Sequence, residues 1–108
     1  MIFSCAKDFY EKVATVQKLT REEEKTLAKA MQNGDSVARE KIIENYLVFV
    51  AARIKRTAYP QSLDLIYHCV SALEQAVDKF DFLQDNEPFS HRLSLLLGKE
   101  IVSYIARV

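Results

Sequence analysis

Apolar residues recur along this chain every three or four positions, which is the spacing of amphipathic helices. The spacing predicts five helices, over about residues 4–17, 20–33, 37–57, 63–82 and 90–108. The chain contains only two Gly and two Pro, so it has few places to reverse tightly, which disfavours a β-sandwich. We therefore expect an all-α fold, a compact bundle of about five helices that forms a single domain over residues 1–108.

Signals at the helix ends support this division of the chain. Thr20 and Glu23 have the spacing of a capping box, in which each side chain accepts a hydrogen bond from the backbone of the other. Gly34 is expected to take the left-handed conformation that ends the second helix. Asp35 or Ser36 then caps the third helix, so the second and third helices should meet at a tight corner.

The apolar stripes of the last three predicted helices indicate a common core. The apolar stripe of the third predicted helix, over about residues 37–57, is wide enough to face two neighbouring helices. The inner positions expected of the last two helices are Leu65, Ile66, Cys69, Leu73, Ala76, Val77 and Phe80, followed by Leu93, Leu97, Ile101, Tyr104, Ile105 and Val108. Leu95 and Val102 fall off this stripe, so they either widen the core or form an exposed apolar pair that would mark a partner surface.

Composition and charge narrow the classes of function. Fifteen Lys and Arg balance fifteen Asp and Glu, whereas proteins that coat nucleic acid or membranes carry a strong excess of one sign. The longest apolar run, residues 46–52, is far shorter than the roughly 18 residues of a membrane span. Residues 1–5 are too short an apolar stretch before Lys7 and Asp8 to predict a signal peptide. Two free thiols, Cys5 and Cys69, are typical of a reducing cytoplasm. No second ligand pair accompanies His68 and Cys69, so we expect no metal or other cofactor.

The order of residues in three blocks is more informative than their period. The blocks are Leu19-Thr20-Arg21-Glu22-Glu23-Glu24 with Leu27-Ala28, Asn33-Gly34-Asp35 and residues 38–44; then Leu63-Asp64-Leu65-Ile66 with residues 76–81; and finally Phe89-Ser90 with Ile101 and residues 104–107. Over residues 19–107 they resemble region 2 of bacterial RNA polymerase sigma factors of the sigma-70 type. Residues 1–18 would form a preceding helix similar to region 1.2. The chain does not include the −35-binding domain of complete sigma factors, so we expect it to be either a fragment or a naturally short relative that works with a partner.

The resemblance implies a protein-docking site on the fourth helix, which in sigma factors binds the coiled coil of the polymerase clamp. Leu63 and Asp64 match the family. Tyr67 and His68 replace its Gln and Glu and are expected on the outer face, and Glu74 replaces a usually apolar residue. These five positions are candidate contacts to the polymerase core or to a partner sigma or anti-sigma protein. Asp64 also suits the first turn of a helix for electrostatic reasons.

The segment that reads and opens promoter DNA in the family departs from its pattern. Leu95 and Leu96 replace a Trp pair that stacks on unpaired bases, and the preceding loop, residues 82–87, is acidic where phosphate contacts need cations. Gly98 and Lys99 stand where Arg and Gln are common. We therefore expect weak promoter binding and no independent promoter melting. The cations that keep a candidate role in DNA binding are Arg53, Lys55, Arg56, Arg92, Lys99 and Arg107.

Two charge clusters have alternative interpretations. Arg53, Lys55 and Arg56 close the third helix, where they either complement the helix dipole or contact nucleic acid or polymerase. Residues 64–87 hold six carboxylates against Lys79 alone. They form either a docking surface for a basic partner or a solvated face.

Together these features predict a sigma-factor-like transcription protein that binds the polymerase core or a partner sigma module and modulates initiation. The alternative is a protein-interaction module on the same scaffold that binds itself or a regulator and no longer contacts polymerase. No nucleophile–base pair, phosphate-binding loop or metal cluster can be assembled from the sequence. We therefore expect no enzyme activity, no small-molecule substrate and no membrane partner.

Overall fold

A computed structural model describes residues 2–83 and 87–108 and contains five α-helices in this part of the chain. They are α1 (Ala6–Thr15), α2 (Arg21–Gln32), α3 (Ser36–Lys55), α4 (Leu63–Lys79) and α5 (Phe89–Arg107). No strand occurs among the described residues. The expected all-α globule of five helices is therefore confirmed.

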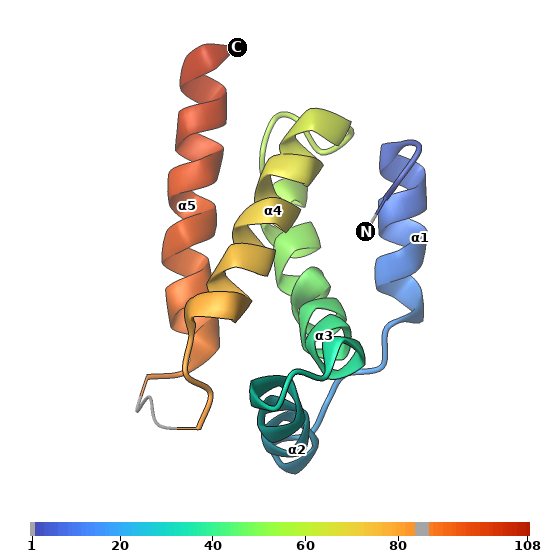
Figure 1. The fold of residues 1–108 in the computed structure, drawn as a ribbon. Coiled ribbons are helices and arrows are strands. Elements are labelled where there is room, and N and C mark those ends of the chain that lie inside the picture. The colour runs from blue at the N-terminus through green and yellow to red at the C-terminus, as the bar shows by residue number, and fades with distance from the viewer. Residues whose placement is uncertain (1, 84–86) are drawn as a thin grey trace.

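Helix α3 is central to the arrangement, because it packs against each of the other four helices. Helices α4 and α5 pack against one another beside it, α1 lies against α3 and α4, and α2 crosses the start of α3 (Figure 1). The expectation that the third helix faces more than one neighbour is confirmed.

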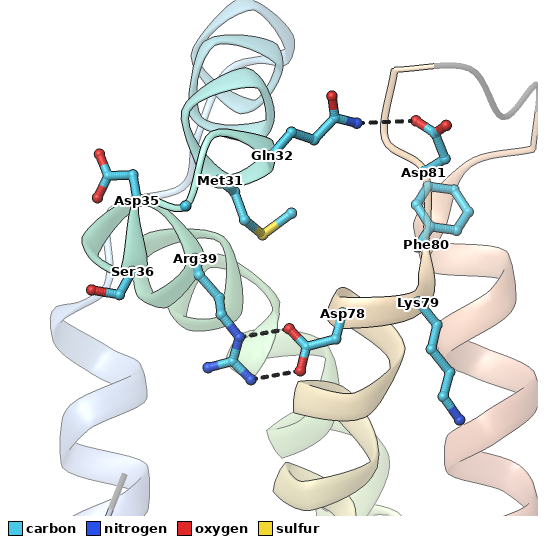
Figure 2. Close-up of a pocket in the computed structure, with 10 residues that line it drawn as sticks. Met31, Gln32, Asp35, Ser36, Arg39, Asp78, Lys79, Phe80 and Asp81 are labelled. Carbon is cyan, nitrogen blue, oxygen red and sulfur yellow. Dashed lines mark hydrogen bonds and ion pairs between the residues drawn. The ribbon is translucent and has the colours of Figure 1, made fainter.

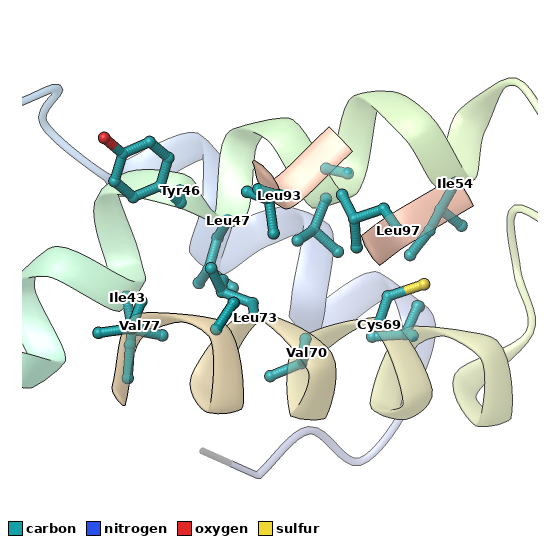
Figure 3. Packing of buried hydrophobic residues seen from close by; sticks show 14 of the residues in the cluster. Ile43, Tyr46, Leu47, Ile54, Cys69, Val70, Leu73, Val77, Leu93 and Leu97 are labelled. Carbon is teal, nitrogen blue, oxygen red and sulfur yellow. The ribbon is translucent and has the colours of Figure 1, made fainter. Parts of the chain in front are cut away.

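The core is formed mainly where α3, α4 and α5 meet (Figure 3). Leu47 and Ile54 of α3, Leu73 of α4, and Leu93 and Leu97 of α5 are all essentially inaccessible to solvent. Burying one such side chain contributes roughly 1.5–3 kcal/mol relative to leaving it exposed. The shared core therefore fixes how the outer faces of α4 and α5 are presented.

Local hydrogen bonds define the helix ends as predicted. The Thr20 hydroxyl accepts a hydrogen bond from the Glu23 amide at 3.1 Å, and the Glu23 carboxylate accepts one from the Thr20 amide at 3.0 Å. The hydrogen bond that the Thr20 amide donates to the Glu23 carboxylate is the main cause of the lowered pKa of Glu23. Gly34 has a φ of 93°, in the region that side chains disfavour. Asp35, rather than Ser36, caps α3.

Helix α4 ends three residues before its predicted end, at Lys79. Phe80 continues in extended backbone, which ends the helical hydrogen bonding and turns the chain toward α5. The Phe80 ring packs edge-on against Phe89, with 5.1 Å between centroids, and Phe89 in turn packs against Tyr46 at 4.7 Å. This aromatic cluster joins the end of α4 to the start of α5. Helix α1 is also two residues shorter at each end than predicted.

The prediction that Ile105 and Val108 face the core is wrong. Their exposed fractions are 46% and 65%, whereas Tyr104 is buried. The Tyr104 hydroxyl is 2.8 Å from the hydroxyl of Ser62, the residue that caps α4. Helix α5 therefore extends beyond the start of α4 (Figure 1), and its end leaves Ile105 and Val108 exposed.

Candidate docking surfaces on helices α4 and α5

The start of α4 presents an exposed carboxylate. Ser62 caps this helix by accepting a hydrogen bond from the Leu65 amide at 3.1 Å. Asp64 follows in the first turn with 73% of its side chain exposed, and its carboxylate lies 3.6 Å from the imidazole of His68 on the next turn. Leu63 packs partly against the core. The structure thus places Leu63, Asp64 and His68 together at one end of α4, with Asp64 free to approach another molecule.

Tyr67 does not lie on an open outer face, contrary to the prediction. Its hydroxyl accepts a hydrogen bond from the Phe3 amide and donates one to the Phe3 carbonyl, each at 2.6 Å. The Phe3 ring is buried and packs edge-on against Phe9 of α1, with 5.3 Å between centroids. The segment before α1 therefore covers this side of α4, and Tyr67 acts as an anchor within the chain.

Glu74, also on α4, is partly exposed. A bidentate ion pair joins α4 to α3 (Figure 2). Arg39 of α3 donates to both carboxylate oxygens of Asp78, at 2.6 and 2.9 Å. These hydrogen bonds lower the pKa of Asp78, and they raise that of Arg39 with a smaller contribution from the charge of Glu74. Glu74 thus belongs to an electrostatic cluster between α3 and α4.

This ion pair borders a hollow of about 500 Å³ between the α2–α3 corner and the end of α4. Across the hollow, the Gln32 amide reaches the Asp81 carboxylate at 3.5 Å (Figure 2). Among the carboxylates of residues 64–87, Asp78, Asp81 and Glu87 each approach another side chain, whereas Asp64 is largely exposed beside His68. Asp85 lies outside the described residues.

Two of the three cations at the end of α3 make contacts within the protein. Arg53 donates to the carbonyl and hydroxyl oxygens of Ser94 on α5, at 3.2 and 2.8 Å. The ammonium group of Lys55 lies 5.0 Å from the centroid of the Tyr10 ring on α1. Arg56 is exposed at the C-cap. The trio therefore joins elements and ends a helix, rather than forming one free basic patch.

The remaining candidate cations lie on α5. Arg92 is 3.9 Å from Glu87 and lies over the Phe80 ring, 5.6 Å from its centroid. Lys99 is exposed, and Arg107 is exposed in the last turn. Arg92 and Lys99 line a groove between α4 and α5, whereas Arg53 and Lys55 contact Ser94 and Tyr10, so the structure does not bring the six cations predicted for DNA binding together in one pocket.

A groove of about 480 Å³ runs between α4 and α5 and has a basic lining. Lys79, Arg92 and Lys99 contribute positive charge to it, and Glu100 contributes one carboxylate. His68 also lines the groove, at the end nearest the start of α4. The structure thus joins one predicted protein contact, His68, with two predicted DNA contacts, Arg92 and Lys99.

The outer face of α5 carries Leu95 and Val102, for which the sequence permits either a place in the core or an exposed position. Leu95 and Val102 each have an exposed fraction of 68%, so they do not widen the core. Gly98 lies between them, and a Cβ atom there would be 3.4 Å from the Arg53 guanidinium. A Cβ at this distance makes an ordinary van der Waals contact, so the space around position 98 admits alanine.

Sequence reasoning missed one buried polar residue, Asn45, within the apolar stripe of α3. It is 7% exposed, and its side-chain oxygen accepts a hydrogen bond from the Leu19 amide at 2.8 Å. On the next position, the Tyr46 hydroxyl donates to the Glu24 carboxylate at 2.7 Å. Burial, and to a smaller extent this bond to Glu24, raise the pKa of Tyr46. The two contacts fix the α1–α2 connection and α2 against α3.

No group of three or more His, Cys, Asp or Glu side chains in residues 2–83 and 87–108 is arranged to hold a metal ion. Within the same residues, no helix is sufficiently long and apolar to cross a membrane. No model of a known protein family matches this chain.

Proposed function

We propose that this protein is a sigma-region-2-like transcription module that binds RNA polymerase core, or a partner sigma module, through the start of α4. The observation that carries the proposal is the exposure of Asp64 in the first turn of this helix, at the position where the resemblance implies docking on the clamp coiled coil. Leu63 beside it offers a partly exposed apolar contact.

The packing of the three sequence blocks supports the same proposal. Arg39 of the first block pairs with Asp78 of the second, and Phe89 of the third packs against Phe80 of the second. The three sequence blocks that resemble sigma region 2 therefore contact one another in one folded unit. A module of this kind presents α4 and α5 as binding elements.

The role proposed is protein binding, without independent opening of promoter DNA. Arg53 and Lys55 are engaged with Ser94 and Tyr10, which reduces the number of cations free to contact phosphates. Leu95, at a base-stacking position of the family, offers no aromatic face. We further propose that the protein has no catalytic activity of its own.

A pull-down with core RNA polymerase tests this proposal. The full chain is expected to retain core polymerase, and Asp64→Lys is expected to weaken retention by about tenfold, because it reverses a charge at the docking site. Glu22→Lys makes the same charge change on the exposed face of α2 and should retain polymerase like the unaltered chain. No retention by the folded unaltered chain, or undiminished retention by Asp64→Lys, would contradict the proposal.

A further inference from the structure

Helix α5 is apolar on two faces, and only one of them is covered within this chain. Leu93, Leu97 and Ile101 are buried against the bundle. Leu95 and Val102 lie two turns apart on the opposite face and are 68% exposed. The solvent-facing side of an amphipathic helix usually carries polar residues, so Leu95 and Val102 depart from the usual pattern. This pair therefore marks a surface that is suited to a second molecule.

Cations border the exposed pair on both sides. Arg92 and Lys99 lie on the side of α5 that faces the α4–α5 groove, and Arg53 lies on the α3 side, where it bonds to Ser94. The one carboxylate of α5, Glu100, lies in the groove rather than beside the apolar pair. The surface therefore combines an apolar centre with a positive border.

We infer that the outer face of α5 is a docking surface for an acidic amphipathic helix of a partner protein. The apolar face of such a helix would pack on Leu95 and Val102. Its flanking carboxylates would approach Lys99 and Arg92, whose charges are complementary. The adjoining groove gives the partner's longer side chains room beside Leu96.

The same features argue against a second copy of this chain as the occupant. Antiparallel pairing of two α5 helices would bring Leu95 of each copy toward Val102 of the other. It would also bring Lys99 and Arg92 of both copies into one interface, where like charges repel.

A nucleic acid fits this surface less well than a protein helix. Phosphates would be attracted to Arg92 and Lys99, but they gain nothing from contact with Leu95 and Val102. An acidic amphipathic helix can pair its carboxylates with the cations and, at the same time, cover Leu95 and Val102 with its apolar face. This surface lies on α5, whereas the proposed polymerase contact lies at the start of α4 around Asp64. The two proposals can therefore be tested independently.

Two synthetic helical peptides test the inference. Both carry leucines at alternating spacings of three and four residues; one has glutamates beside them and the other has lysines at the same positions. Each fluorescently labelled peptide is titrated with the full chain while anisotropy is measured. We expect the glutamate peptide to bind at least about tenfold more tightly than the lysine peptide. Raising the salt concentration should reduce this preference.

Variants of the chain locate the binding site. Leu95→Asp should weaken binding of the glutamate peptide by about tenfold or more. Val37→Asp, which makes the same kind of change at an exposed position at the start of α3, should leave it unchanged. A double variant, Arg92→Glu with Lys99→Glu, should reverse the preference between the two peptides. Because this double variant keeps the apolar pair and changes only exposed charges, it tests the inference even if Leu95→Asp misfolds.

Several results would overturn the inference. These are equal affinity for the two peptides, absence of saturable binding by either, or a preference that survives the Arg92 and Lys99 reversals. A concentration-dependent dimer that Leu95→Asp abolishes would assign the surface to a second copy. Displacement of the glutamate peptide by a single-stranded oligonucleotide at equal concentration would assign it to nucleic acid. Asp64→Lys should leave peptide binding unchanged, which separates this result from the failure of polymerase docking.

Discussion

The Tyr67 hydroxyl is bonded to both backbone groups of Phe3, accepting from its amide and donating to its carbonyl at 2.6 Å each. These residues are 64 positions apart in the chain. The contact closes the N-terminal segment over one side of α4. It also limits the proposed polymerase-docking surface to the edge of α4 that carries Asp64 and His68.

Tyr67→Phe should therefore loosen the N-terminal segment and lower the free energy of unfolding by about 1–2 kcal/mol, because two partly buried backbone groups lose their partner. Urea denaturation measures the free energy, and hydrogen exchange of the Phe3 amide measures the local effect. Tyr59→Phe is the control, because the Tyr59 side chain is exposed. Equal amide protection in Tyr67→Phe and the unaltered chain would contradict this account of the anchor.

Asn45→Ala should destabilise the protein by about 1–3 kcal/mol, since it removes the acceptor of the Leu19 amide at a buried position. The loss should be concentrated at the α1–α2 connection. Thermal unfolding followed by circular dichroism gives the overall change, and exchange of the Leu19 amide locates it. Asn33→Ala, at the exposed end of α2, is the matched control, and a loss of stability as large as that of Asn45→Ala would contradict the prediction.

The Arg39–Asp78 pair should make stability depend on pH. Because its pKa in the folded protein lies below the ordinary value of 3.8, ionised Asp78 stabilises the fold above that pH. The contribution should disappear as the pH falls from 3.8 through the lower pKa of the folded state. Solvent screens this half-exposed pair, so we expect Asp78→Asn to cost about 1 kcal/mol or less at neutral pH.

Urea denaturation of Asp78→Asn and the unaltered chain at neutral and strongly acidic pH checks this dependence. The difference in unfolding free energy should shrink toward zero in acid. Glu22→Gln, which neutralises an exposed carboxylate on α2, should show a much smaller difference at both pH values. A difference for Asp78→Asn that persists in strong acid would show that the charge pair is not its source.

The two thiols should differ in reactivity. Burial raises the pKa of Cys69 to about 12, and the charge of Glu100 adds to this effect, whereas Cys5 is exposed. Only a thiolate reacts readily with disulfide reagents, so Cys69 should remain unmodified near neutral pH. Titration with an aromatic disulfide reagent should modify one thiol in the folded protein and two in urea. Rapid modification of both thiols without denaturant would contradict the buried position of Cys69.

Local signals in the sequence were sufficient for much of the fold. The Thr20–Glu23 capping box and the turn at Gly34 involve residues that are close in the chain, so their spacing predicts their geometry. Periodicity also predicts which face of α5 carries Leu93. It does not reveal how far the neighbouring helix extends, and for this reason the prediction of a buried Ile105 is wrong.

The parts of the candidate site that escaped prediction depend on contacts between distant segments. Nothing near Tyr67 in the sequence indicates that Phe3 covers it, because the contact depends on the path of the chain before α1. The exposure of Leu95 was likewise open, since an apolar residue at the edge of a helical stripe fits either a wide core or an interface. The positions of α3 and α4 decide between these alternatives, because both helices pack on the opposite face of α5 and leave Leu95 exposed.

The most direct test of the central proposal is the affinity of the full chain for the isolated coiled coil of the polymerase clamp, measured by titration calorimetry. The proposal predicts saturable binding with one site, weakened about tenfold by Asp64→Lys and unchanged by Glu22→Lys. Absence of binding by the folded unaltered chain, or equal affinities of the unaltered chain and Asp64→Lys, would contradict it.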